Sequence, residues 1–141
     1  MSFEKIMSIG GTGLNAQLVR MNATASNLAN AGVVSGNEDT AFRAQRPVFA
    51  TMLPDNLGPD SLDLQGGVRV DRIVNDLKPI EKIYEPGNAL ADDDGYVFAS
   101  NVKEIEELID MLDASRAYQN NVEVINTAKD LLSRTLDLIK V

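Results

Sequence analysis

The last 46 residues of the chain contain neither glycine nor proline, and no other feature constrains the fold as much. All five prolines lie between residues 47 and 86. Proline removes a backbone hydrogen bond and clashes with the preceding turn of a helix, so this partition favours helices at both ends of the chain. The sequence therefore predicts a helix in 1–31, a turn-rich middle with short strands in 32–100, and a second helix in 101–141.

The C-terminal segment has apolar side chains at alternating steps of three and four, the spacing of a coiled-coil seam. Asn101 with Glu104 three residues later has the spacing of a capping box, which predicts Asn101 as the N-cap. A helix of about 39 residues would be roughly 58 Å long, too long for the remainder of the chain to cover. Eight of the ten seam positions are apolar: Leu108, Met111, Ser115, Tyr118, Val122, Ile125, Lys129, Leu132, Leu136 and Ile139.

The N-terminal segment has a matching seam and almost no charge. Arg20 is the only charged residue from Gly11 to Ala31, although the outer face of a solvated helix normally carries charges. The nearby glycines are expected to interrupt the helix. A helix that is weak alone and uncharged is expected to order when neighbours surround it. The seam positions are Leu14, Leu18, Met21, Ala25 and Leu28.

The middle segment has strand candidates at 42–53 and 67–74, separated by glycine and proline turn signals. It is marginal as an independent hydrophobic core. The predicted fold class is α+β, mainly α, with long terminal helices packed as a coiled-coil-like pair around a small β-rich middle. The two helices together are expected to form one assembly domain.

Composition excludes several classes of function. Thirteen basic residues against 21 acidic ones give a net charge of −8 and a pI near 4.4, which argues against nucleic-acid binding. The absence of cysteine and histidine removes the usual nucleophile, general base and metal ligands, so we expect no enzyme, cofactor or metal site. No apolar run is long enough to span a membrane, and the N-terminus lacks the pattern of a cleaved signal peptide.

Two short motifs suggest ligands, and neither has the required context. Gly11-x-Gly13-x-x-Ala16 matches the dinucleotide fingerprint, but a poor strand precedes it and no further βαβ units follow. The acidic run at 92–95 suggests calcium, yet the corresponding EF-hand ligand positions would be Leu90 and Asn101. An interrupted helix and an acidic turn are the better interpretations, while a dinucleotide enzyme stays an alternative.

Three segments in order resemble the bacterial flagellar axial protein family. The first runs from Thr12 through Ser26-Asn27-Leu28-Ala29-Asn30. The second is Tyr84-Glu85-Pro86-Gly87-Asn88 followed by Gly95-Tyr96-Val97, and the third extends from Met111 to Asn126. The resemblance implies a structural subunit of the rod that joins the membrane-embedded ring to the hook and transmits torque. A helical adaptor or an export chaperone of a secretion system is the alternative.

The resemblance also implies partners and a location. They are other rod proteins, copies of the chain itself, the basal-body membrane-ring protein and, transiently, the type III export gate. The location implied is the periplasmic rod, reached without a cleaved signal peptide. The resemblance also implies that the export gate reads Phe3 and Met7, which are four residues apart; the alternative is that both residues continue the helical seam, since Met7 lies seven residues before Leu14. The seam residues expected to form subunit interfaces are Leu14, Leu18, Met21, Leu28, Leu108, Met111, Tyr118, Val122, Ile125, Leu132, Leu136 and Ile139.

Overall fold

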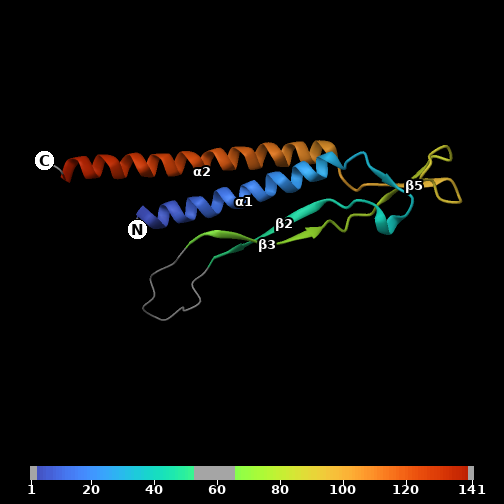
Figure 1. Ribbon diagram of the computed structural model, residues 1–141, viewed down its shortest axis with the longest axis horizontal. Helices are drawn as coiled ribbons and strands as arrows, with labels where there is room; N and C mark the ends of the chain where they lie inside the picture. The colour runs from blue at the N-terminus through green and yellow to red at the C-terminus, as the bar shows by residue number, and fades with distance from the viewer. Residues whose placement is uncertain (1–2, 53–65, 140–141) are drawn as a thin grey trace, which may run out of the picture.

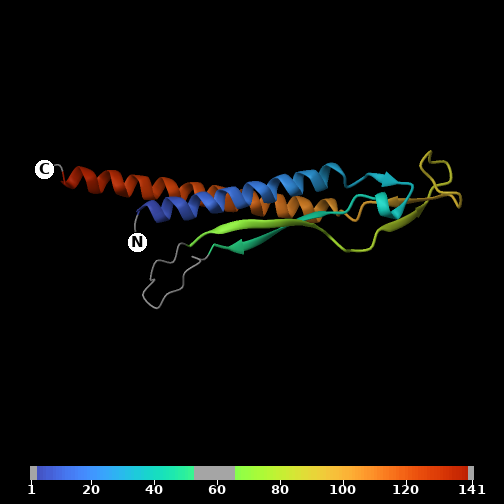
Figure 2. The ribbon, with the colours of Figure 1, turned by 60° about the horizontal axis from the view of Figure 1, so that its bottom comes forward.

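A computed structural model describes residues 3–52 and 66–139 of the chain (Figure 1). Two long helices lie side by side in antiparallel directions, and α2 extends past the N-terminus of α1 (Figures 1 and 2). A two-stranded hairpin runs along α1, and a small sheet lies at the end of the molecule opposite to the chain termini. Long terminal helices packed together as a pair, with a small β-rich middle, confirm the predicted fold class.

Helix α1 (Phe3–Ala29) is continuous through Gly10, Gly11 and Gly13. The expected interruption at these glycines is therefore wrong. Glycine lowers intrinsic helix stability, but α1 packs against α2 on one side and the hairpin on another, and tertiary packing outweighs propensity.

Helix α2 (Glu104–Ile139) begins two residues later than an N-cap at Asn101 would place its first residue. The prediction of Asn101 as its N-cap is wrong because the Asn101 side chain is bonded elsewhere. Its Oδ1 accepts the Ala44 N–H at 2.7 Å, and its Nδ2 donates to the carbonyls of Asp76 and Lys78 at 3.1 and 3.0 Å. Asn101 thus joins the segments that flank the hairpin instead of closing a helix end.

The hairpin pairs β2 (Gln45–Thr51) with β3 (Val68–Asn75) in antiparallel register. Both strands lie inside the predicted segments, apart from the last residue of β3. The register shifts between Val48 and Phe49, a bulge that increases the local twist. Thr12 of α1 accepts the Val68 N–H at 3.2 Å through its Oγ1, so α1 and the hairpin are directly bonded.

The second sheet has the strand order β1–β5–β4, all antiparallel. Its strands are β1 (Val34–Ser35), β4 (Glu81–Tyr84) and β5 (Tyr96–Ala99), and a short 3₁₀ helix, η1 (Glu38–Thr40), follows β1. Val97 in the central strand is fully buried. Tyr84 and Tyr96 pack edge to face at the pair of residues that ends the β4–β5 ladder.

Candidate assembly surface

The contact between α1 and α2 is made by small and polar side chains. Asn27 lies against Glu107 and Arg20 against Asp110. At the other end of the pair, an added methyl group at Gly13 would lie 3.0 Å from Asn121 Nδ2, and one at Gly10 would lie 2.8 Å from Ile125 Cγ1. Glycine at both positions lets the helices approach closely.

These contacts define two repeats of seven residues. In α1 the positions are Gly13, Arg20 and Asn27; in α2 they are Glu107, Ala114, Asn121 and Ala128. Ala114 is fully buried and Ala128 almost so. Because most of these residues are not large and apolar, a search for hydrophobic periodicity passes over them. Only their fixed spacing from Gly13 and Glu107 could have identified them.

The intramolecular contact therefore lies one position away from the predicted seams. Ile125 belongs to it, and Met111 and Tyr118 are half-buried like Ile125, but Glu107 and Asn121 take the places that the sequence assigned to Leu108 and Val122. A strict 3.5-residue repeat drifts by about 20° per seven residues on a helix of 3.6 residues per turn. The predicted seam consequently begins and ends outside the α1 contact.

Large apolar side chains remain exposed on both helices. Leu18 is 47% exposed at the centre of α1. On α2, Leu108 is 47% and Leu136 is 50% exposed. Of the other predicted interface residues, Leu132 is exposed and Leu14, Met21, Leu28 and Val122 are half-buried, while the side chain of Ile139 lies outside the described part.

A buried polar cluster ties three elements together at the sheet end of the helix pair. Glu107, from α2, is fully buried, and its carboxylate contacts Arg46 Nη2 of β2 at 2.7 Å and Asn27 Nδ2 of α1 at 3.0 Å. Arg46 also donates to Asp110 Oδ2 at 2.9 Å, and Arg20 donates to the other oxygen of that carboxylate at 3.1 Å. We call these five residues the polar clamp.

Asn27 connects the polar clamp to the backbone of β2 through two hydrogen bonds. Its Oδ1 accepts the Gln45 N–H at 2.7 Å, while its Nδ2 donates to the Gln45 carbonyl at 2.9 Å. The side-chain amide thereby substitutes for a neighbouring strand. The side-chain amide of Asn27 is fully buried, and both its oxygen and its nitrogen are hydrogen-bonded. Asn27 therefore fixes the start of the hairpin against the helix pair. Asn27 lies in the first of the three segments that carry the family resemblance, but that segment does not indicate this role.

An apolar groove opens at the other end of the pair. It has a volume of about 730 Å³ and lies between Phe3 and Ile6 of α1 and the C-terminal half of α2. Its α2 wall is Asn120, Glu123, Val124, Thr127, Ala128, Leu131, Leu132 and Thr135. Beyond this groove α2 continues without α1 beside it, and Leu138 is 78% exposed.

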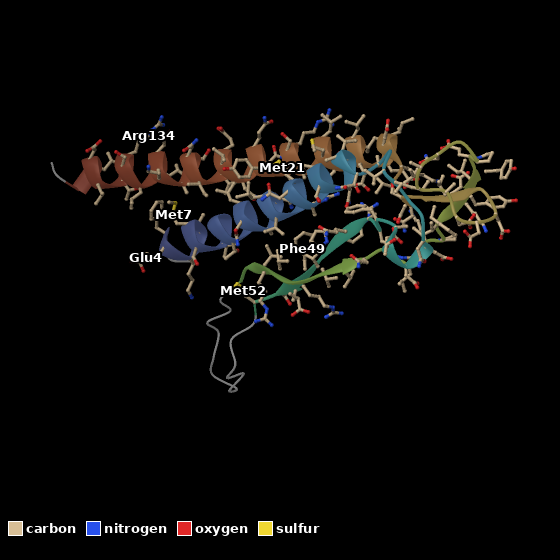
Figure 3. All side chains as sticks on the ribbon, turned by 45° about the vertical axis from the view of Figure 1, so that its right-hand side comes forward. Glu4, Met7, Met21, Phe49, Met52 and Arg134 are labelled. Atoms are coloured by element: carbon tan, nitrogen blue, oxygen red, sulfur yellow. The ribbon has the colours of Figure 1, made fainter. Side chains whose placement is uncertain are left out.

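The proposed export residues are both half-buried in the first turns of α1. Figure 3 shows Met7 on the side of α1 that faces α2, as Met21 does, whereas Glu4 points away from α2. Phe3 lines the apolar groove. Both side chains thus continue the helix-pair packing in the folded chain.

The acidic turn at 92–95 uses its first carboxylate internally. Asp92 Oδ1 accepts the N–H groups of Tyr96 and Asp94, and the bond from Tyr96 holds the pKa of Asp92 below its usual value. Lys82 adds an ion pair at 3.6 Å. Within residues 3–52 and 66–139, no group of three or more acidic side chains is arranged to hold a metal ion, and no helix there is long and apolar enough to cross a membrane.

Two family models match the chain at the segments that form the helix pair. A "flagella basal body rod protein" model matches residues 7–36, and a "flagellar basal body rod FlgEFG protein C-terminal" model matches residues 93–138. The matched regions contain all of the polar clamp except Arg46.

Curated relatives match over nearly the whole chain. Flagellar basal-body rod proteins FlgC from Yersinia enterocolitica, Escherichia coli O157:H7 and Salmonella typhimurium are 43%, 42% and 41% identical over 138 residues, which is 98% of this chain and 98% of each relative. These relatives do not favour the adaptor or chaperone alternative. The chain belongs to the flagellar basal-body rod protein family and is a structural subunit of the rod.

Proposed function

We propose that the helix pair, 1–31 with 101–141, is the assembly domain by which this subunit joins its neighbours in the rod. The observation that carries the proposal is the distribution of side chains in the pair: the buried residues of both helices are small or polar, while several large aliphatic residues, such as Leu18, Leu108 and Leu136, are exposed. A monomer would hide its large aliphatic groups, because each buried side chain of this size contributes roughly 1.5–3 kcal/mol. Contacts with neighbours are the remaining way to bury them.

The predicted seams are the surface that we assign to these contacts. On ideal helices, Leu14 and Leu18 of α1 and Leu108 and Val122 of α2 lie beside the intramolecular contact, on the same side of the pair. Their side chains are half-buried or exposed, so a further helix packing there would complete their burial. Other rod proteins, copies of this chain and the membrane-ring protein are the partners that we propose.

Deletion of the gene tests this function most directly. Basal bodies isolated from the deletion strain and viewed by electron microscopy are expected to lack the rod and to regain it when the wild-type gene is supplied. Intact rods in the deletion strain would contradict the proposal. A catalytic role is not part of it: calorimetry with NAD, ATP and calcium is expected to show no saturable heat.

Export through the flagellar type III apparatus into the periplasm, without a cleaved signal peptide, completes the proposal. Phe3 and Met7 are its proposed recognition residues. Phe3→Ala is expected to leave the protein in the cytoplasm when cells lacking the next rod component are fractionated. Ile6→Ala is the matched control because Ile6 lines the same groove as Phe3. If both variants reach the periplasm, Phe3 acts in packing and not in recognition.

A further inference from the structure

The first turns of α2 carry an exposed apolar stripe. Ile105 is 74%, Leu108 47%, Ile109 54% and Leu112 58% exposed. Their spacing of three and four places them on one face of the helix, centred on the side away from α1. We call these four residues the α2 stripe. Four exposed aliphatic side chains in two turns are an unusual surface for a monomer.

The exposed face of α1 is complementary to the α2 stripe in size. Its residues recur at steps of four and three between the α2 and hairpin contacts, and except for Leu18 they are small or medium-sized: Ser8, Gly11, Asn15, Leu18, Asn22, Ala25 and Ala29. We call them the open face of α1. Bulky side chains of one helix pack well into spaces left by small side chains of another.

The two surfaces are also compatible in charge. The α2 stripe is flanked by the carboxylates of Glu104 and Asp113 and by one guanidinium, that of Arg116, and none of the three has an ion-pair partner among the residues that the structure describes. In a chain of net charge −8, most surfaces would repel these carboxylates. The open face of α1 carries no charge from Ser8 to Ala29, and the side-chain amides of Asn15 and Asn22 can donate hydrogen bonds to carboxylates.

The polar clamp places the C-terminal part of the open face, from Asn22 to Ala29, at the same height along the helix pair as the α2 stripe. Asn27 is opposite Glu107, and Arg20 is opposite Asp110, so Asn22 is level with the α2 stripe. The two surfaces point in different directions within one chain. A contact between them must therefore join two chains side by side, and because it uses different patches it leaves one copy of each patch free to continue the array.

We infer that the α2 stripe of one copy packs against the open face of α1 in a second copy of this chain. The inference rests on the proposed function, since it states which surfaces meet when subunits assemble. Such a contact is heterologous and repeats around or along an axis, as a rod requires. A symmetric pair of stripes would instead close after two copies and stop growth.

Disulfide cross-linking tests the inference cleanly, because the chain has no cysteine. The pair Asn22→Cys and Ile109→Cys in one chain is expected to give a ladder of covalent multimers after oxidation of isolated basal bodies. The pair Asn22→Cys and Leu138→Cys is the control, since Leu138 is exposed on α2 at the far end of the pair. It is expected to give no ladder.

Other outcomes separate failure of the inference from failure of the function. Rods that contain the doubly substituted chain without any ladder, or with a cross-link to a different protein, overturn the inference alone. If rods isolated from the wild-type strain do not contain this chain, the proposed function fails as well.

If the cysteine variants do not assemble, two variants that place opposite charges at Asn22 test the inference instead. Asn22 is exposed, so neither Asn22→Asp nor Asn22→Lys should unfold the monomer. Opposite the carboxylates that flank the α2 stripe, Asn22→Asp is expected to reduce the number of rods at least tenfold relative to Asn22→Lys. Equal numbers of rods in the two variants would overturn the inference.

Discussion

The two ends of the helix pair are held together by different means. At the sheet end, the polar clamp connects α1, α2 and β2 through charged and amide groups, of which Glu107 and Asn27 are fully buried. At the end near the N-terminus, Gly10 and Gly13 bring the helices close, and an apolar groove stays open beside them. Past this groove α2 continues alone.

The difference shows which part of the subunit is complete in one chain. Buried charges are stabilised only when partners surround them, and the clamp supplies those partners from within the molecule. Leucines such as Leu131 and Leu138 are instead largely exposed, at 60% and 78%. The clamp end therefore defines the shape of the subunit, and the open end and outer faces are left for neighbours.

Charging an outer face should have the largest effect on assembly and little effect on the subunit itself. Leu18→Asp is expected to abolish rods while leaving the urea unfolding curve of the purified chain within about 0.5 kcal/mol of the wild type, since Leu18 is half exposed. Ile125→Asp should abolish rods and also destabilise the helix pair, because Ile125 packs against Gly10 and a buried unpaired carboxylate costs several kcal/mol. Rods in the Leu18→Asp strain would show that this face is not an interface.

Removing the Glu107 carboxylate tests whether the polar clamp holds the sheet end of the helix pair together. Glu107→Ala leaves Arg46 and Asn27 without their shared acceptor and is expected to lower the free energy of unfolding by about 3 kcal/mol, measured by urea titration with circular dichroism. Glu104→Ala, on the exposed side of the same helix turn, is the control and should change it by less than about 0.5 kcal/mol. Equal effects would show that the clamp does not hold the elements together.

Alanine substitutions at the adjacent residues Gly10 and Gly11 should have the smallest effect. They test how closely α1 approaches α2. Nothing lies within 4 Å of a methyl group added at Gly11, so Gly11→Ala is expected to stabilise the chain by about 1 kcal/mol through helix propensity. A methyl group at Gly10 would lie 2.8 Å from Ile125, and the overpacking is expected to cancel that gain or reverse it. Equal stabilisation in thermal unfolding would mean that the helices are not in close contact there.

Sequence patterns predicted the helices but misplaced the contact between them by one residue. Hydrophobic periodicity included Ile125, which packs against Gly10, because isoleucine is large and apolar. It could not identify Asn121 or Ala128, since asparagine and alanine carry no distinctive signal in a single sequence. The subunit interface assigned to the seam residues stays a prediction, as does the export role of Phe3 and Met7.

The absence of proline from both ends of the chain, the 3.5-residue spacing and the low charge near Arg20 were enough to predict two long helices with uncovered surface. These are local properties, and local backbone preference and side-chain periodicity are enough to specify them. Only the tertiary structure decided that Asn27, Arg46 and Glu107 meet, because their contacts join residues separated by up to 80 positions. In the sequence, Glu107 is one of several acidic residues at the start of a helix. In the structure it is buried against Arg46 and Asn27, and these contacts make it the centre of the polar clamp. No local pattern encodes them.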